Sequence, residues 1–143
     1  MNTANSLTLG DPVLDQEHAE LQRLIDALLE APAEGAIAAL EALQLHAASH
    51  FGLEDGELRR LGGANATCHL DEHAAVLRSL DEVRAVLARP EPPGDLVSRL
   101  ATELLRWLPE HVQEMDAGIA AVRTRERFGG VPVQITRRAS SGS

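Results

Sequence analysis

The stretch His69-Leu70-Asp71-Glu72-His73 places two histidines four residues apart. Residues at this spacing are neighbours on one face of a helix, so both imidazoles are predicted to point the same way. The same spacing occurs upstream, in His50-Phe51-Gly52-Leu53-Glu54. A further histidine precedes both motifs at His18, and a five-residue step joins His111 to Asp116. At 100° per residue, that last step would leave the two side chains about 140° apart on an α-helix.

These positions offer five imidazoles and two carboxylates, which exceeds the four ligands of a structural zinc site. Neutral imidazoles mixed with carboxylates suit iron, manganese or copper. Buried in a core, such a cluster would be very costly without a compensating ion. The set therefore predicts two metal ions that share bridging carboxylates inside a helical bundle. The candidate metal ligands are His18, His50, Glu54, His69, His73, His111 and Asp116.

Apolar residues recur at three- and four-residue steps through four successive segments, which predicts four amphipathic helices. The first is expected to begin at Asp11-Pro12 or at Asp15 and to end before Pro32. The second is expected over residues 34–61, because Gly62-Gly63 favours the left-handed conformation that ends a helix.

The third helix is expected to cap on Asn65 or Thr67 and to stop before the proline-rich break at 90–94. The fourth should begin at Asp95 and kink at Pro109, because proline lacks an N–H donor. Four long helices joined by short loops predict an all-α, up-down-up-down antiparallel four-helix bundle with a two-metal centre in its core.

Composition narrows the class of protein further. The chain has 143 residues, 44% of them hydrophobic, which is enough for one domain with a real core. We expect a flexible arm over 1–10, the bundle over 11–127 and a tail over 128–143. A net charge of −9 argues against binding to nucleic acid, whose phosphates attract cations.

All thirteen basic residues are arginines, and five of them gather near the C-terminal end. The simplest interpretation of this basic end is a solvated helix end and tail, and a contact for a protein partner is the alternative. These arginines are Arg123, Arg125, Arg127, Arg137 and Arg138.

The sequence also indicates a compartment. Cys68 is the only cysteine, so no disulfide can form within the chain. The first residues show neither the basic nor the apolar region of a signal peptide, so we expect none, and no apolar run is long enough to span a membrane. We therefore expect a cytoplasmic protein with no membrane partner, and we expect Cys68 to be a small buried residue.

The motifs fall in a fixed order: LDxxH at 14–18, HFxxE followed by an acid at 50–55, HxxxH at 69–73 and WxxxHxxxxD at 107–116. Over roughly residues 10–125 this pattern resembles the hemerythrin family, especially its bacterial members. The resemblance implies two iron ions, cycling between Fe2+ and Fe3+ and joined by an oxo or hydroxo bridge. It also implies O2 as the ligand, bound end-on at an open position of one iron. The implied roles are His69, His73 and His111 on one iron, His18 and His50 on the other, and Glu54 and Asp116 bridging both.

Two further residues are candidates for the cofactor pocket. His46 lies one turn before His50, where bacterial members often carry tyrosine. It could be an eighth ligand, a second-layer or pocket residue, or plain packing. Trp107 lies four residues before His111, either as a pocket wall that excludes water or as ordinary core packing.

Reversible O2 binding, for storage, delivery or sensing, is the function this pattern favours over catalysis. Carboxylate-rich di-iron proteins use Glu-x-x-His motifs, and this chain has none. The alternatives are a di-iron redox enzyme (peroxidase, nitric-oxide scavenging or iron oxidation) and a signalling bundle whose metal biases a conformation read by a partner. Motifs of serine hydrolases, phosphate-binding loops and zinc proteases are missing from the sequence.

Overall fold

The computed structural model describes residues 7–127, so the predictions for residues 1–6 and for the tail over 128–143 lie outside it. Within the described residues the chain forms helices and no strand. The elements, in chain order, are α2 (Pro12–Glu30), the short 3₁₀ turn η1 (Ala33–Gly35), α3 (Ala36–Leu61), α4 (Ala64–Leu87), α5 (Leu96–His111), the π-helical segment η2 (Val112–Asp116) and α6 (Ala117–Arg127).

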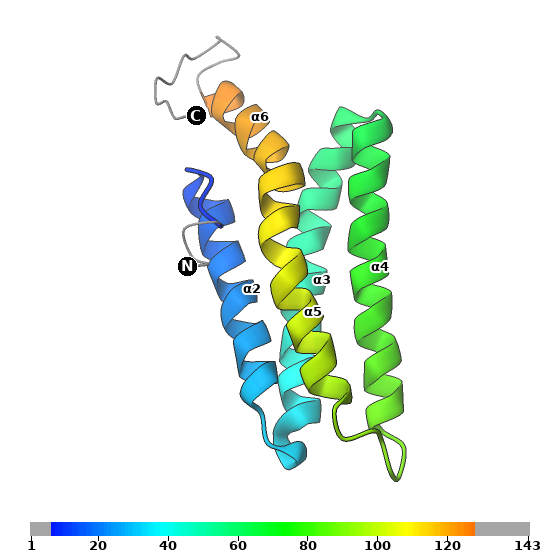
Figure 1. Ribbon diagram of the computed structural model, residues 1–143. Coiled ribbons are helices and arrows are strands. Elements are labelled where there is room, and N and C mark those ends of the chain that lie inside the picture. The colour runs from blue at the N-terminus through cyan, green and yellow to red at the C-terminus, as the bar shows by residue number, and fades with distance from the viewer. Residues whose placement is uncertain (1–6, 128–143) are drawn as a thin grey trace.

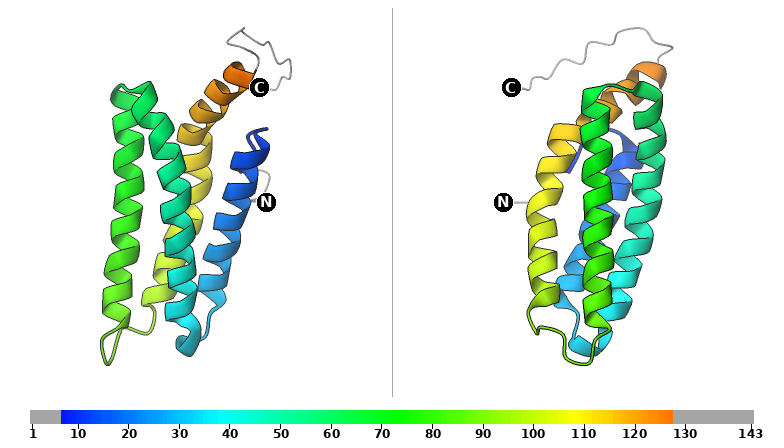
Figure 2. Two further views of the ribbon diagram at one scale, coloured as in Figure 1. Left: turned by 180° about the vertical axis from the view of Figure 1, so that it is seen from behind. Right: turned by 90° about the vertical axis from the view of Figure 1, so that its right-hand side faces the viewer.

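Helices α2, α3, α4 and α5 run side by side in alternating directions, which confirms the predicted antiparallel bundle (Figure 1). α6 continues the path of α5 and leans away from α3 and α4 at the end where those two helices are joined (Figure 2). No helix of the described chain has the length and apolar character needed to cross a membrane.

The helix ends follow from the residues found there. The side chain of Asp11 caps α2 by accepting hydrogen bonds from the amides of Val13 and Leu14, as the sequence predicts. Gly62 and Gly63 have φ angles of 69° and 96°, a region open to glycine, and they separate α3 from α4. The prediction of a cap at Asn65 or Thr67 is wrong, since α4 starts at Ala64 without a side-chain cap.

The fourth predicted helix is continued through a π-helical segment. Pro109 lies inside α5, and η2 begins three residues later. In a π-helix the hydrogen bonds run from residue i to i+5, so side chains five positions apart lie nearer to one face than they would on an α-helix.

The core lies along the bundle axis on both sides of the cluster of polar residues described next. Leu28, Leu40 and Leu108 are fully buried in the larger apolar group. Leu7 is also buried in it, and Leu9 packs against it. Both residues belong to the predicted N-terminal arm over 1–10, so the described end of this arm packs against the core. The division into arm, bundle and tail otherwise stays a prediction.

Candidate metal centre

All seven residues predicted as metal ligands meet in one buried layer of the bundle. None is more than 3% exposed. They come from all four helices of the bundle, with His18 on α2, His50 and Glu54 on α3, His69 and His73 on α4, and His111 and Asp116 at the junction of α5 and η2.

The ligand atoms form two overlapping groups, each with its atoms within 4.8 Å of one another. Glu54 and Asp116 belong to both groups, whereas each histidine belongs to one. Two acids shared between two sets of imidazoles are what a pair of bridged metal ions needs. The first group adds His69, His73 and His111, and the second adds His18 and His50.

The π-helical turn corrects the expected angle between His111 and Asp116. An α-helix would turn these side chains well apart, but η2 widens the turn and brings them together. His111 Nε2 lies 3.3 Å from Asp116 Oδ1. The irregular turn therefore allows a five-residue step to supply two ligands to one site.

Distances within the cluster fit atoms arranged around metal ions. Two ligand atoms, each about 2.1 Å from a metal and at right angles, lie about 3.0 Å apart. The Nε2 atoms of His69 and His73 lie 3.2 and 3.1 Å from Nε2 of His111. His18 Nε2 lies 2.9 Å from Asp116 Oδ2. A ring nitrogen is either a hydrogen-bond donor or an acceptor, so three of them that meet at one point cannot satisfy one another. Their three lone pairs can instead bind one metal ion.

Several of these buried atoms have no hydrogen-bond partner. They are His18 Nε2 and both carboxylate oxygens of Glu54 and of Asp116. Leaving buried polar atoms unpaired is costly, so such atoms need an explanation. Close approach without hydrogen-bond orientation is expected when lone pairs point at a common centre, and the residues present therefore fit a bound metal pair.

The family model described as Hemerythrin HHE cation binding domain matches residues 9–122. The chain belongs to the hemerythrin family. It is 34% identical over 115 residues to a bacteriohemerythrin of Ralstonia nicotianae (strain ATCC BAA-1114 / GMI1000), covering 79% of this chain and 81% of that protein. It is 26% identical over 110 residues to a bacteriohemerythrin of Aquifex aeolicus (strain VF5), covering 77% and 84%. No solved structure matches the chain significantly.

The electrostatics of this cluster would couple the binding of a metal ion to the release of protons. Burial lowers the pKa of His18, but the carboxylates of Asp116 and Glu54 outweigh it and raise the pKa to about 9. Burial pulls the pKa of each of those two carboxyl groups up, yet the surrounding histidines hold it below its ordinary value. In the metal-free protein at neutral pH, His18 holds a proton where a metal needs a lone pair, so binding a metal there would release that proton.

Aromatic rings cover one side of the hemerythrin centre. Phe51 stacks on His73 with ring centroids 4.0 Å apart, and Trp107 stacks on His111 at 4.4 Å. Trp107 therefore lies against the cluster and packs on the core, and a role in excluding water stays a prediction. It also donates a hydrogen bond from Nε1 to Glu72 Oε1.

His46 lies outside both groups of ligand atoms. Its ring is parallel to that of His50 at 6.0 Å, and its Nε2 lies 3.2 Å from the backbone oxygen of Glu17. This places it in the layer around the cluster. Cys68 is exposed, so the expectation of a buried cysteine is wrong: it sits one position before His69, and the turn of the helix carries it away from the core.

Three acidic residues, for which the sequence predicts no role, contact the outer nitrogens of the histidines. They are Glu17, Asp55 and Glu72. Each stands next to a candidate ligand in the sequence, which is the signal that could have identified them.

Proposed function

We propose that this chain binds two iron ions in the cluster and uses them to take up O2 reversibly. The observation that carries the proposal is the pair of overlapping ligand groups that share Glu54 and Asp116. A bound iron pair would supply the electrons that O2 accepts on binding and returns on release. The cluster is rich in imidazole and poor in carboxylate, which favours binding over oxidation of a substrate.

The two iron positions would differ in how many ligands the chain provides. His69, His73 and His111 would hold one iron, with Glu54 and Asp116 shared. The other would have only His18 and His50 besides the shared acids. Metal centres that act on an external molecule keep a position free of protein ligands, so the second position is where we place the O2 site.

The burial of the cluster supports reversible binding. All seven ligands are buried, and Phe51 lies against His50 of the two-histidine position as well as against His73 of the other, with ring centroids 5.7 and 4.0 Å apart. A dry site slows the loss of bound O2 in a reduced form, so O2 can leave as it arrived.

Iron analysis and an optical spectrum of the reduced protein, before and after exposure to air, test the proposal. We expect two irons per chain and a new charge-transfer band that vanishes when O2 is removed. Glu54→Ala should lose the band, and His46→Ala should keep it. Fewer than two irons in fully loaded protein, or no reversible band, would refute the proposal.

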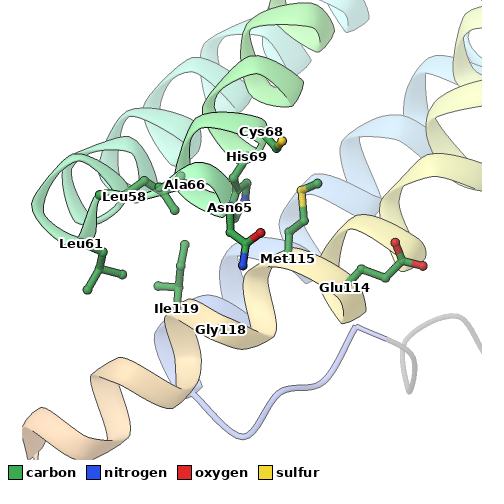
Figure 3. Close-up of a pocket in the computed structure, with 11 residues that line it drawn as sticks. Leu58, Leu61, Asn65, Ala66, Cys68, His69, Glu114, Met115, Gly118 and Ile119 are labelled. Carbon is green, nitrogen blue, oxygen red and sulfur yellow. The ribbon is translucent and has the colours of Figure 1, made fainter.

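A redox enzyme is the second candidate, and one observation favours it. A cavity of about 400 Å³ opens beside His69, between the α3–α4 end of the bundle and α6 (Figure 3). Its lining includes the apolar Leu58, Met115 and Ile119 as well as the polar Asn65. A small molecule bound there would contact a ligand of the three-histidine position. Sustained consumption of peroxide or nitric oxide, with rapid decay of the oxygenated form, would favour this candidate.

A protein partner at the basic C-terminal end, like the cytoplasmic location, stays a prediction. Two of the three arginines on α6 already have partners within the chain, since Arg123 and Arg127 contact Asp11. The signalling alternative would therefore depend on Arg125 and on the arginines beyond the described residues.

A further inference from the structure

We propose that three acidic residues outside the cluster are positioning residues, each of which orients a metal-binding histidine on the next helix of the bundle. The inference deepens the proposed function and rests on it, because it assumes metal ions in the cluster. The three residues are Glu17 on α2, Asp55 on α3 and Glu72 on α4.

The closest of these contacts joins α4 to α5. Glu72 Oε1 lies 2.6 Å from Nδ1 of His111 and accepts a second hydrogen bond, 2.9 Å long, from Trp107 Nε1. The side chain of Glu72 is one-third exposed, whereas His111 is buried. One carboxylate oxygen thus fixes both the ligand and the ring stacked on it.

The other two contacts repeat this arrangement across the preceding pairs of helices. Asp55 Oδ1 on α3 lies 2.8 Å from Nδ1 of His73 on α4. Glu17 Oε1 on α2 lies 3.2 Å from Nδ1 of His50 on α3. Both acids are partly exposed at the seam between their helix and the next.

Each contact selects one form of the imidazole ring. A carboxylate can only accept, so Nδ1 must carry the proton, and the lone pair is then on Nε2. The Nε2 atoms of His50 and His73 face the cluster, 3.1 and 3.2 Å from the oxygens of Glu54. Partners of this kind fix the ring and make it a stronger ligand.

The positions of the acids follow from the direction of each helix. One residue corresponds to a turn of 100°, so an acid next to an inward ligand faces a seam of the bundle. The helices alternate in direction (Figure 1). Moving one residue toward the N-terminus on α2 or α4 therefore turns the same way around the bundle axis as moving one residue toward the C-terminus on α3. The observed pairs follow this rule, with Glu17 before His18, Asp55 after Glu54 and Glu72 before His73.

The same rule shows where the series stops. At the junction of α5 and η2 a step forward from His111 or Asp116 reaches Val112 or Ala117, and neither side chain is acidic. The histidine of α2 on the far side of that seam is His18. Its Nδ1 is buried and has no hydrogen-bond partner among the described residues.

The acids act on different metal positions. Glu72 and Asp55 orient two histidines of the three-histidine position, whereas Glu17 orients His50 of the other. Glu72→Ala should therefore weaken the binding of one Fe(II) ion by about 10–100-fold and leave the second ion little changed, because outer partners of ligands typically contribute this much. Glu17→Ala should weaken the other ion.

The test is anaerobic titration with Fe(II) in competition with a chelator, applied to Glu72→Ala, Asp55→Ala, Glu17→Ala, Glu72→Gln and a control. Glu72→Gln should lose less affinity, since donors from Trp107 and His111 hold its amide oxygen in place. Asp71→Asn is the control, because Asp71 is exposed beside Glu72 and loses the same charge. We expect the control to bind within twofold of the wild type.

Nitrogen NMR of the imidazole rings in the Zn(II)-loaded protein provides a second measurement. His50, His73 and His111 should carry the proton on Nδ1, and Glu72→Ala should change the signal of His111 alone.

If the circular dichroism spectrum of Glu72→Ala is not that of a helical protein, the result for Glu72→Gln decides. Alanine variants of Glu72 and Asp55 that bind Fe(II) as tightly as Asp71→Asn would overturn the inference. A wild type that cannot hold two Fe(II) ions would instead refute the proposed function, and the ring signals would still decide the positioning.

Discussion

The ion pair between Asp11 and Arg123 joins α2 to α6 close to the metal centre. Asp11 lies seven residues before His18, and Arg123 lies seven residues after Asp116. Seven residues are about two helical turns, and the two segments are antiparallel. The ion pair therefore lies two turns along the same pair of helices from the 2.9 Å contact between His18 and Asp116. Removing Asp11 should therefore loosen the packing that brings these two ligands together.

The structure sets the expected cost. Asp11 is 1% exposed, caps α2 and accepts a 2.6 Å hydrogen bond from Arg123 Nε. Losing a cap costs about 1 kcal/mol. Arg123 is 31% exposed, so we expect its charged hydrogen bond to stabilise the fold by about 1–2 kcal/mol, which is less than a fully buried bond of this kind contributes. Asp11→Ala should then lower the free energy of unfolding by about 2–3 kcal/mol, and Asp11→Asn, which keeps the cap, by about 1–2 kcal/mol.

Thermal and urea unfolding of the metal-free protein measure these costs. At about 3 °C per kcal/mol, the melting temperature should fall by roughly 6–9 °C for Asp11→Ala and 3–6 °C for Asp11→Asn. Asp95→Ala is the control, because Asp95 precedes α5 in the same way but makes no capping hydrogen bond and pairs with Arg99 in solvent. Its effect should stay below about 0.5 kcal/mol. If Asp11→Asn melted at the same temperature as the wild type, the ion pair with Arg123 would not stabilise the fold and the reasoning would be refuted.

The pH dependence has a definite sign. Burial pulls the pKa of Asp11 up, but hydrogen bonds from Arg123 and from the backbone of α2 outweigh it, and the pKa is held below its ordinary 3.8. A carboxyl group whose pKa is lower in the folded protein than in the unfolded chain stabilises the fold. This stabilisation is complete when the pH is above the pKa of the unfolded chain, and it is lost as the pH falls through the pKa of the folded protein. The stability gap between wild type and Asp11→Asn should be equal at pH 5 and pH 7 and should shrink below pH 3.8.

Three further predictions concern the centre and α3. Glu54→Ala removes an acid shared by both ligand groups and should lower the iron content to one or none per chain; two retained irons would contradict the bridging role. His46→Ala should leave the iron content near two, because His46 belongs to neither group, and a fall to one would show that it is a ligand. Gly52 and Gly56 are exposed inside α3, and an added Cβ would meet nothing within 4 Å. Gly52→Ala and Gly56→Ala should each stabilise the protein by about 0.5–1 kcal/mol in urea unfolding, and a loss of stability would show that these glycines are needed.

Much of the fold was predictable because its signals are local. Asp11 and Pro12 mark the start of α2, and Gly62 and Gly63 mark the end of α3, through backbone preferences that need no tertiary contact. The sequence predicts the start of α4 too late, because Ala64 directly follows those glycines and no side chain caps the helix there.

The candidate site was predictable in its members but not in all of its geometry. Spacing identified the pair His69 and His73 because both lie on one regular α-helical face. The pairing of His111 with Asp116 needed a π-helical turn, which the apolar periodicity does not reveal, although the five-residue step itself matches the i to i+5 repeat. The roles of Glu17, Asp55 and Glu72 were not predicted because their histidine partners lie on other helices. The periodicity of one helix does not show which residues of a neighbouring helix an acid will contact.

The proposed function requires that seven side chains hold two metal ions and that these ions share two carboxylates. A crystal structure of the iron-loaded protein, with anomalous differences measured at the iron edge, would show whether they do. We predict two iron peaks, both in contact with Glu54 and Asp116, one surrounded by His69, His73 and His111 and the other by His18 and His50. A single peak, or two peaks without a shared carboxylate, would contradict the claim.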